Sequence, residues 1–346
     1  MTQPLLSICI NTRNRAEFLA ETLESMISQI NGGVEIVVVD GASNDSTPAV
    51  MLKYAAKYKY IKYVRSDDDI GIDDGYDLSV ENARGEYCWL MPDDDIACNG
   101  AVEKILSEIK NDFDLIILNV ELFTKNLSFD LKQRMFDFNE DKIYLREQLG
   151  TFFSEFGFGL SYIGCVVIKR NIWFEHDRSQ FYGSFFIHVG VIFGSGNISK
   201  ILCLNKPLIK YRSANSSWSP RSFEIWYLKW PALVWSFERL TKQVKANITS
   251  FTPWERGMTL LKSRAMDEYR YSVFKTYLVS SGTVKIRLRN AFISILPVTL
   301  LNFLLVAFCL IFKRNNLYTI YTLIMSSKYS ISLSHLSALF GVKLNI

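Results

Sequence analysis

The sequence is poor in the residues that most often bind zinc. Its 346 residues include three His and six Cys, and no two Cys form a CxxC pair. We therefore expect the cysteines to be free, buried thiols in a reducing cytosol. The chain also contains neither GxGxxG nor GxxxxGK[ST], so it signals neither a dinucleotide-binding loop nor a P-loop.

Acidic residues are missing from the last part of the chain. From Tyr269 to Ile346 there are nine Lys and Arg but no Asp or Glu, whereas the residues before Tyr269 include 30 basic and 35 acidic ones. A basic tail suits an anionic membrane surface, where each nearby cation contributes about 1 kcal/mol. Long apolar runs inside the tail argue against nucleic acid as its partner.

An uncharged run of 22 residues, Ala291 to Phe312, lies inside this basic tail. Its length would suffice for a single membrane span, which remains an alternative. Basic residues on both sides, among them Lys313 and Arg314, and the internal Pro297 argue against a span. We therefore predict a monotopic or re-entrant anchor at about residues 285–341, docked on a cytoplasmic leaflet. The opening segment MTQPLLSICI has no basic stretch, so no signal peptide is expected.

Short apolar strands and amphipathic helices alternate along the first part of the chain. The strands are predicted at residues 5–10, 34–39, 61–64, 86–91, 113–120, 160–168 and 208–211. This alternation predicts an α/β domain at residues 1–220, with a mostly parallel, Rossmann-like sheet and helices on both faces. Residues 221–346 are predicted to be helical, with helices at 223–244 and 254–280 before the anchor.

Polar residues follow three of the predicted strands directly. They are Asn11, Thr12 and Arg13 after the first strand, Asp40 after the second, and Asp93, Asp94 and Asp95 after the fourth. The carboxyl ends of parallel strands meet at one edge of an open sheet, where ligands of α/β folds bind. We therefore expect these side chains to share one crevice.

The three consecutive carboxylates at 93–95 predict a metal site. Oxygen ligands without His or Cys nearby favour Mg²⁺ or Mn²⁺ over zinc, and Mg²⁺ typically takes one or two carboxylates plus substrate phosphates. The alternative is an acidic loop that caps the helix beginning near Asn99. The loop before the fourth strand adds Asp73, Asp74 and Asp77, which would repel one another unless some bind a cation, a sugar hydroxyl or an Arg.

Three segments, SICINTRNRAEFL, VEIVVVDGASNDST and ARGEYCWLMPDDDI, resemble the amino-terminal half of family 2 glycosyltransferases. That family has the GT-A fold and uses nucleotide-sugar donors. The segments GIDDGYDLSVENARGEYCWLMPDDDI, LSYIGCVVIKR and FYGSFFIHVGVIF are similar to the abequosyltransferase subset, which transfers a dideoxyhexose during O-antigen assembly. The resemblance covers roughly residues 5–215.

The resemblance implies a role for each polar residue at the sheet edge. Asn11, Thr12 and Arg13 match the loop that contacts the nucleobase, although Arg13 stands where the family usually has Tyr. Asp40 matches the acid that holds the base or ribose, Asp93 the acid toward the ribose, and Asp94 the metal ligand, with Asp95 as an alternative ligand. Pro92 stands at the first position of the family's DxD-type motif.

Two further candidate site residues lie later in the chain. His188 falls where the family usually presents its catalytic acid, so it is either the general base for an acceptor hydroxyl or a core residue. Arg212 is expected to close over the departing diphosphate.

The implied reaction moves a sugar from a CDP-, UDP- or GDP-linked donor to a polyprenyl-diphosphate-linked oligosaccharide at the bacterial inner membrane. The alternative is a catalytically inactive nucleotide-binding subunit that recruits a partner to the membrane; a nucleotidyltransferase is a lesser option. Whether the anomeric configuration is inverted or retained stays open.

Overall fold

The structure is a computed structural model that describes residues 3–344. These residues form two compact units. Unit 1 comprises residues 3–121, 134–211 and 237–248, and unit 2 comprises residues 122–133, 212–236 and 249–344. The predicted domain division after residue 220 remains a prediction.

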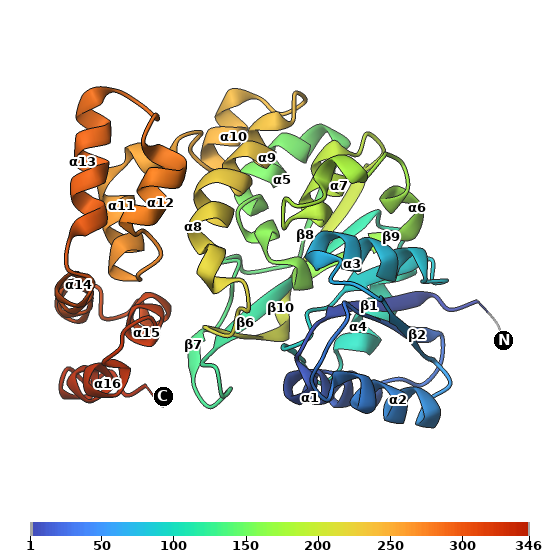
Figure 1. The fold of residues 1–346 in the computed structure, drawn as a ribbon. Helices are drawn as coiled ribbons and strands as arrows, with labels where there is room; N and C mark the ends of the chain where they lie inside the picture. Colours follow the sequence, from blue (N-terminus) through green and yellow to red (C-terminus); the bar gives the residue numbers. More distant parts are fainter. Residues whose placement is uncertain (1–2, 345–346) are drawn as a thin grey trace. The chain divides into compact units, whose positions relative to one another are not determined.

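A ten-stranded mixed sheet runs through the chain (Figure 1), in the order β3-β2-β1-β4-β9-β6-β10-β5, with β7 on β6 and β8 on β10. The strands are β1 (Leu6–Thr12), β2 (Val34–Asp40), β3 (Ile61–Arg65), β4 (Tyr87–Leu90), β5 (Ile96–Ala97), β6 (Leu115–Phe123), β7 (Asp130–Lys132), β8 (Lys142–Leu145), β9 (Val166–Lys169) and β10 (Lys200–Arg212).

The first four strands form the parallel part of the sheet, as predicted. β1 pairs in parallel with β2 and β4, and β2 pairs in parallel with β3. Every residue of β2 is buried, which is typical of a strand covered on both faces. Beyond β4 the sheet continues with antiparallel pairs: β9 pairs antiparallel with β4 and β6, and β5 and β8 pair antiparallel with β10.

Helices of unit 1 cover both faces of the parallel strands. In Figure 1, α3 lies on one side of β1 and β2, and α1 and α2 lie on the other. The helices of this unit are α1 (Ala16–Ile27), α2 (Thr47–Lys57), α3 (Gly71–Glu81), α4 (Ala101–Ile109), α5 (Leu149–Phe156), α6 (Arg170–Trp173), α7 (Ile187–Gly194) and α10 (Lys242–Ile248). Because these helices cover the faces of the sheet, loops form the edge of the sheet at the carboxyl ends of β1, β2 and β4.

Unit 2 is mostly helical, as predicted, but its helices are shorter than the sequence suggested. They are α8 (Ser222–Glu224), α9 (Trp230–Ser236), α11 (Gly257–Ala265), α12 (Tyr271–Val273), α13 (Val284–Ile295), α14 (Val298–Phe312), α15 (Leu317–Met325) and α16 (Ser330–Leu339). The continuous helix predicted at 254–280 is wrong, because the chain turns after α11 with Asp267 in the left-handed region at φ 60°.

The uncharged run 291–312 is also broken. Leu296 and Pro297 are extended between α13 and α14, and the two helices are bent by 93°. Proline has no N–H to donate and disfavours helical geometry in the residue before it, which explains the break. Among the described residues no individual helix has the length and apolarity to cross a bilayer; α13 and α14 meet that criterion when taken together.

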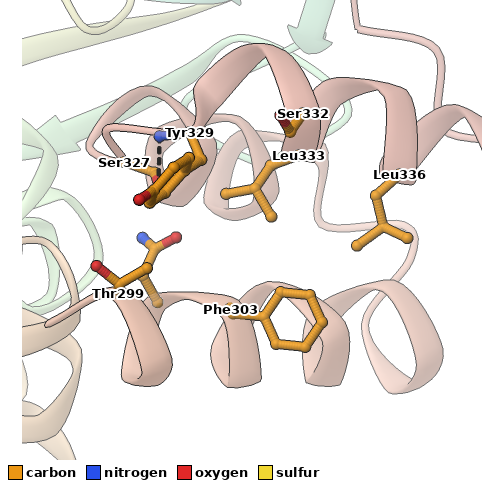
Figure 2. Close-up of a pocket in the computed structure, with 8 residues that line it drawn as sticks. Thr299, Phe303, Ser327, Tyr329, Ser332, Leu333 and Leu336 are labelled. Atoms are coloured by element: carbon orange, nitrogen blue, oxygen red, sulfur yellow. Dashed lines mark hydrogen bonds between the residues drawn. The ribbon is translucent and has the colours of Figure 1, made fainter. Parts of the chain in front are cut away.

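Asn302 ties α14 to its neighbours. Its side-chain Nδ2 donates to Ala265 O at 3.2 Å and to Leu323 O at 2.8 Å, and the residue is almost fully buried. Beside it, a cavity of about 190 Å³ is lined by residues of α14, α16 and the turn before α16 (Figure 2). A polar side chain inside the apolar run therefore serves packing within unit 2.

Candidate active site

The loops after β1 and β2 are tied together at the carboxyl edge of the sheet. Asn14 N donates to Ser43 Oγ at 2.8 Å, and Arg15 N donates to Thr47 Oγ1 at 3.1 Å. Asn14 itself has a positive φ of 54°, a conformation that Asn tolerates better than most residues. These bonds fix the polar loop of β1 against the start of α2.

The loop after β4 joins the same edge through Arg15. The Arg15 guanidinium places Nε 3.5 Å from Asp93 Oδ1 and Nη2 in contact with Asp94 Oδ2. The two carboxylate side chains are 14% and 16% exposed. Burial, followed by the charge of Asp94, raises the pKa of Asp93 to about 7, although Arg15 opposes the shift. One guanidinium thus faces two crowded carboxylates.

Asp95 lies in a different environment from its two neighbours. Its carboxylate accepts a hydrogen bond from Tyr162 Oη at 2.6 Å, and its backbone oxygen accepts one from Thr22 Oγ1 at 2.8 Å. The residue is 1% exposed. Asp95 therefore ties its loop to α1 and to the segment before β9, and its predicted role as an alternative metal ligand stays a prediction.

The loop after β4 fits a divalent metal ion that takes some of its ligands from the protein and the others from a substrate. Within residues 3–344 no three His, Cys, Asp or Glu side chains lie close enough to bind a metal ion by themselves. Asp93 and Asp94 offer two adjacent, partly exposed carboxylates whose mutual repulsion a cation would relieve. Because Mg²⁺ often takes one or two carboxylates plus phosphate oxygens, Asp93 and Asp94 are the residues that would hold such an ion together with a diphosphate.

Asp40 is fully enclosed at the end of β2. Its carboxylate accepts hydrogen bonds from Ser43 N at 2.8 Å, Tyr63 Oη at 2.7 Å and Arg65 Nη1 at 3.1 Å. Burial and the bond to Asp40 raise the pKa of Tyr63 to about 12. Asp40 therefore shapes the loop after β2, and Tyr63 and Arg65 accompany it at the predicted base site.

The three predicted residues of the β1 loop differ in what surrounds them. A Cβ on Gly75 of α3 would lie 2.0 Å from Asn11 Oδ1, so this glycine lets α3 approach the end of β1. Thr12 Oγ1 is buried and has no hydrogen-bond partner in the described part of the chain. Arg13 is exposed and pairs with Asp69, just before α3.

Asp73 and Asp77 of α3 accept hydrogen bonds from residues that lie far away in the sequence. Asp73 accepts hydrogen bonds from Phe185 N at 2.7 Å and Ile187 N at 3.0 Å, and thereby fixes the start of α7, where Phe185 has a strained φ of 73°. Asp77 accepts bonds from Trp173 Nε1 at 2.7 Å and Arg178 Nε at 2.5 Å, and also from Tyr182 Oη.

Of the three acids Asp73, Asp74 and Asp77, Asp74 is the one that is exposed enough to contact a ligand. Asp73 and Asp77 are both 2% exposed, whereas Asp74 is half-buried in the first turn of α3. Burial, followed by the charge of Asp77, raises the pKa of Asp74. Asp73 and Asp77 therefore position α7 and the segment around residues 173–182 in this structure, and their predicted contacts with the substrate stay a prediction.

His188 is enclosed in α7. The residue is 1% exposed, its Nε2 lies 2.7 Å from Leu160 O, and its Nδ1 is buried without a partner in residues 3–344. Because a carbonyl accepts, Nε2 carries the proton and the imidazole is neutral. Burial lowers the pKa of His188 to about 4. The ring is enclosed in this structure, as the core alternative expects, and the predicted role of His188 as a general base stays a prediction.

Arg212 belongs to unit 2. Its Nη1 donates to Lys125 O at 2.9 Å, and the residue is 5% exposed. Its predicted contact with a diphosphate stays a prediction.

The sequence interpretation missed Arg15, which contacts both candidate metal-binding carboxylates. A usable signal was present, because the loop NTRNR follows the strand beside β4 and three consecutive Asp require a cation nearby. Tyr162, the partner of Asp95, lies 67 residues away in the sequence and had no such signal.

Known proteins match the part of the chain that builds this edge. Residues 7–171 match the model of glycosyl transferase family 2. The chain is 28% identical over 235 residues to abequosyltransferase RfbV of Salmonella typhimurium, an alignment that covers 63% of this chain and 69% of that protein. It is 29% identical over 150 residues to the uncharacterized glycosyltransferase MJ1057 of Methanocaldococcus jannaschii, covering 42% of this chain and 52% of that protein.

Solved structures share the fold along most of the chain. S. aureus TarS 1-349 in complex with UDP-GlcNAc has a TM-score of 0.52 at 16% identity, covering 94% of this chain and 92% of that one. The mannosyltransferase PcManGT from Pyrobaculum calidifontis, in complex with GDP-Man and Mn²⁺, has a TM-score of 0.52 at 12% identity, covering 96% and 88%. Since β1 to β4 and their loops lie within the family match, residues 7–171 form a glycosyl transferase family 2 domain in a chain of GT-A-like α/β fold.

Proposed function

We propose that the protein transfers a sugar, a dideoxyhexose such as abequose, from a nucleoside-diphosphate donor to a hydroxyl of a lipid-linked oligosaccharide. The supporting observation is the Arg15, Asp93 and Asp94 cluster at the edge of β1 and β4, beside the Asp40 loop. The RfbV relative supports the sugar class, and the UDP-GlcNAc and GDP-Man complexes support the donor class.

The loops after β1 and β2 would hold the nucleoside. Asn11 offers a carboxamide, Thr12 offers a buried hydroxyl without a hydrogen-bond partner in the described chain, and Arg13 offers a cation at the loop surface. Asp40 is committed to Ser43, Tyr63 and Arg65, so it would act by holding that loop in shape. Asp74 would accept a hydrogen bond from a hydroxyl of the donor sugar.

Asp94, supported by Asp93, would hold Mg²⁺ or Mn²⁺. When bound, the metal supplies positive charge to the diphosphate that leaves the anomeric carbon. Arg15 contacts the same two carboxylates and would offset the repulsion between their negative charges until the donor binds.

Nucleotide release tests this proposal. The protein is incubated with CDP-, UDP- and GDP-sugars, Mn²⁺ and a lipid-linked acceptor, with and without EDTA. We expect release to need the metal, and Asp94→Ala to lower it by about 100-fold or more, because charge stabilisation of the leaving group is lost. The matched control is Asp68→Ala, which removes an exposed acid from the loop before α3 and should leave release unchanged. Full activity in Asp94→Ala would refute the assigned role.

A second candidate is a nucleotide-binding subunit without turnover. The enclosed His188 favours it, because the predicted base itself is buried in α7. Calorimetry separates the two candidates, since the second requires nucleotide binding but no release with any donor and acceptor pair.

A further inference from the structure

Helix α13 exposes an apolar stripe. Val284, Leu288, Phe292 and Ile295 are each between 61% and 67% exposed. Their spacing of four, four and three residues places them on one side of the helix. A helix of a soluble domain normally turns such a stripe toward the core, yet the buried residues of α13 lie on its other side, at Asn290, Ile293 and Ser294.

Helix α14 continues this exposed apolar surface after the 93° bend. Its exposed members recur at helical spacing and are Leu300, Phe303, Leu304, Phe308, Ile311 and Phe312. In Figure 1, α13 and α14 follow one another along the edge of unit 2. Large exposed apolar patches of this kind mark interaction sites, whereas single exposed apolar residues are ordinary.

Cations accompany the apolar surface. A cavity of about 950 Å³ lies at the end of α14, lined by Leu131, Lys132 and residues 311–319. Its lining includes Lys132, Lys313 and Arg314 but no acid. The whole stretch 269–346 carries nine basic residues and no acidic one. An anionic occupant is therefore favoured.

We propose that unit 2 docks on an anionic lipid bilayer through the exposed faces of α13 and α14, with lipid phosphates bound by Lys132, Lys313 and Arg314. The apolar stripes enter the boundary between head groups and acyl chains, which is how amphipathic helices bind a membrane surface. A second copy of the chain is a poorer occupant, because it would bring the same basic residues to the contact. This docking does not depend on the transferase chemistry.

Vesicle flotation tests the docking. The full-length protein is mixed with vesicles of phosphatidylglycerol and phosphatidylcholine, or of phosphatidylcholine alone, and centrifuged in a density gradient. We expect flotation with the anionic vesicles, a decrease at high salt because charges are screened, and weak flotation with the neutral ones.

Two variants assign the binding to these residues. Phe292→Glu should weaken vesicle binding about tenfold or more, because a charge replaces an inserted ring. Lys313→Glu should weaken it about fivefold or more, because it removes a cation near the lipid phosphates. The matched controls are Leu52→Glu and Lys53→Glu on the exposed side of α2, which should bind like the parent protein. Circular dichroism confirms that each variant is folded.

Three results would overturn the proposal. The first is no flotation with either vesicle, and the second is equal flotation of the Phe292→Glu variant and the parent. The third is a stable dimer without lipid that Phe292→Glu dissociates, which would assign the surface to a second copy.

Discussion

The acidic edge of unit 1 and the helices α13 and α14 of unit 2 place their unusual residues in opposite environments. Unit 1 buries Asp40, Asp73, Asp77 and Asp95 and gives each carboxylate a hydrogen-bond partner. Unit 2 leaves large apolar side chains such as Phe292 and Phe312 in solvent. Buried charges fix the shape of a site, but their desolvation costs free energy that only hydrogen-bond or ion-pair partners offset. Exposed apolar groups contribute little to stability until another surface covers them.

The largest effect predicted from this comparison is on folding stability around α3. Asp77→Ala leaves Trp173, Arg178 and Tyr182 without their shared acceptor, and the Arg178 side chain is 15% exposed. Removing one member of a buried ion pair costs about 3–5 kcal/mol, so we expect that loss in urea unfolding. Asp77→Asn, which keeps the shape and one acceptor, should lose less. A loss below about 1 kcal/mol for Asp77→Ala would show that the cluster carries little stability.

His188 should make unit 1 sensitive to acid. Its pKa is about 4 in the folded protein and 6.5 in its ordinary state, so the unfolded chain takes up a proton first. The contribution of His188 to the free energy of unfolding is fully present above pH 6.5. This contribution falls by about 3 kcal/mol as the pH drops toward 4. His188→Gln should flatten this part of the profile measured by urea unfolding at several pH values. The exposed His176 is the control, since His176→Gln should keep the full slope.

The smallest effect is expected for the exposed stripe of unit 2. Leu288→Ser removes a side chain that is 67% exposed and should change the free energy of unfolding by no more than about 0.5 kcal/mol. Leu260→Ala, in the buried core of the same unit, should cost about 2–5 kcal/mol. Equal losses in the two variants would mean that Leu288 is covered in the folded protein, and the contrast between the units would fail.

The amino-acid sequence by itself determined the parallel strands β1 to β4 and the polar loops at their carboxyl ends. Apolar runs of β-branched residues such as VEIVVV are short-range signals, and strand ends in a parallel sheet share one edge. Pro297 likewise acts on its own neighbours, so the break between α13 and α14 follows from local geometry. The continuous helix expected at 254–280 failed because a local pattern does not report where tertiary packing turns the chain.

Only the tertiary structure decided what each polar residue contacts. Asp77 meets Trp173 from 96 residues away, Arg15 meets Asp94 from 79, and Asp95 meets Tyr162 from 67. Adjacent acids with equal sequence signals, such as Asp94 and Asp95, thus acquire different environments. The physical reason is that burial and hydrogen bonding depend on which distant segments pack together, and no pattern within one segment contains that information.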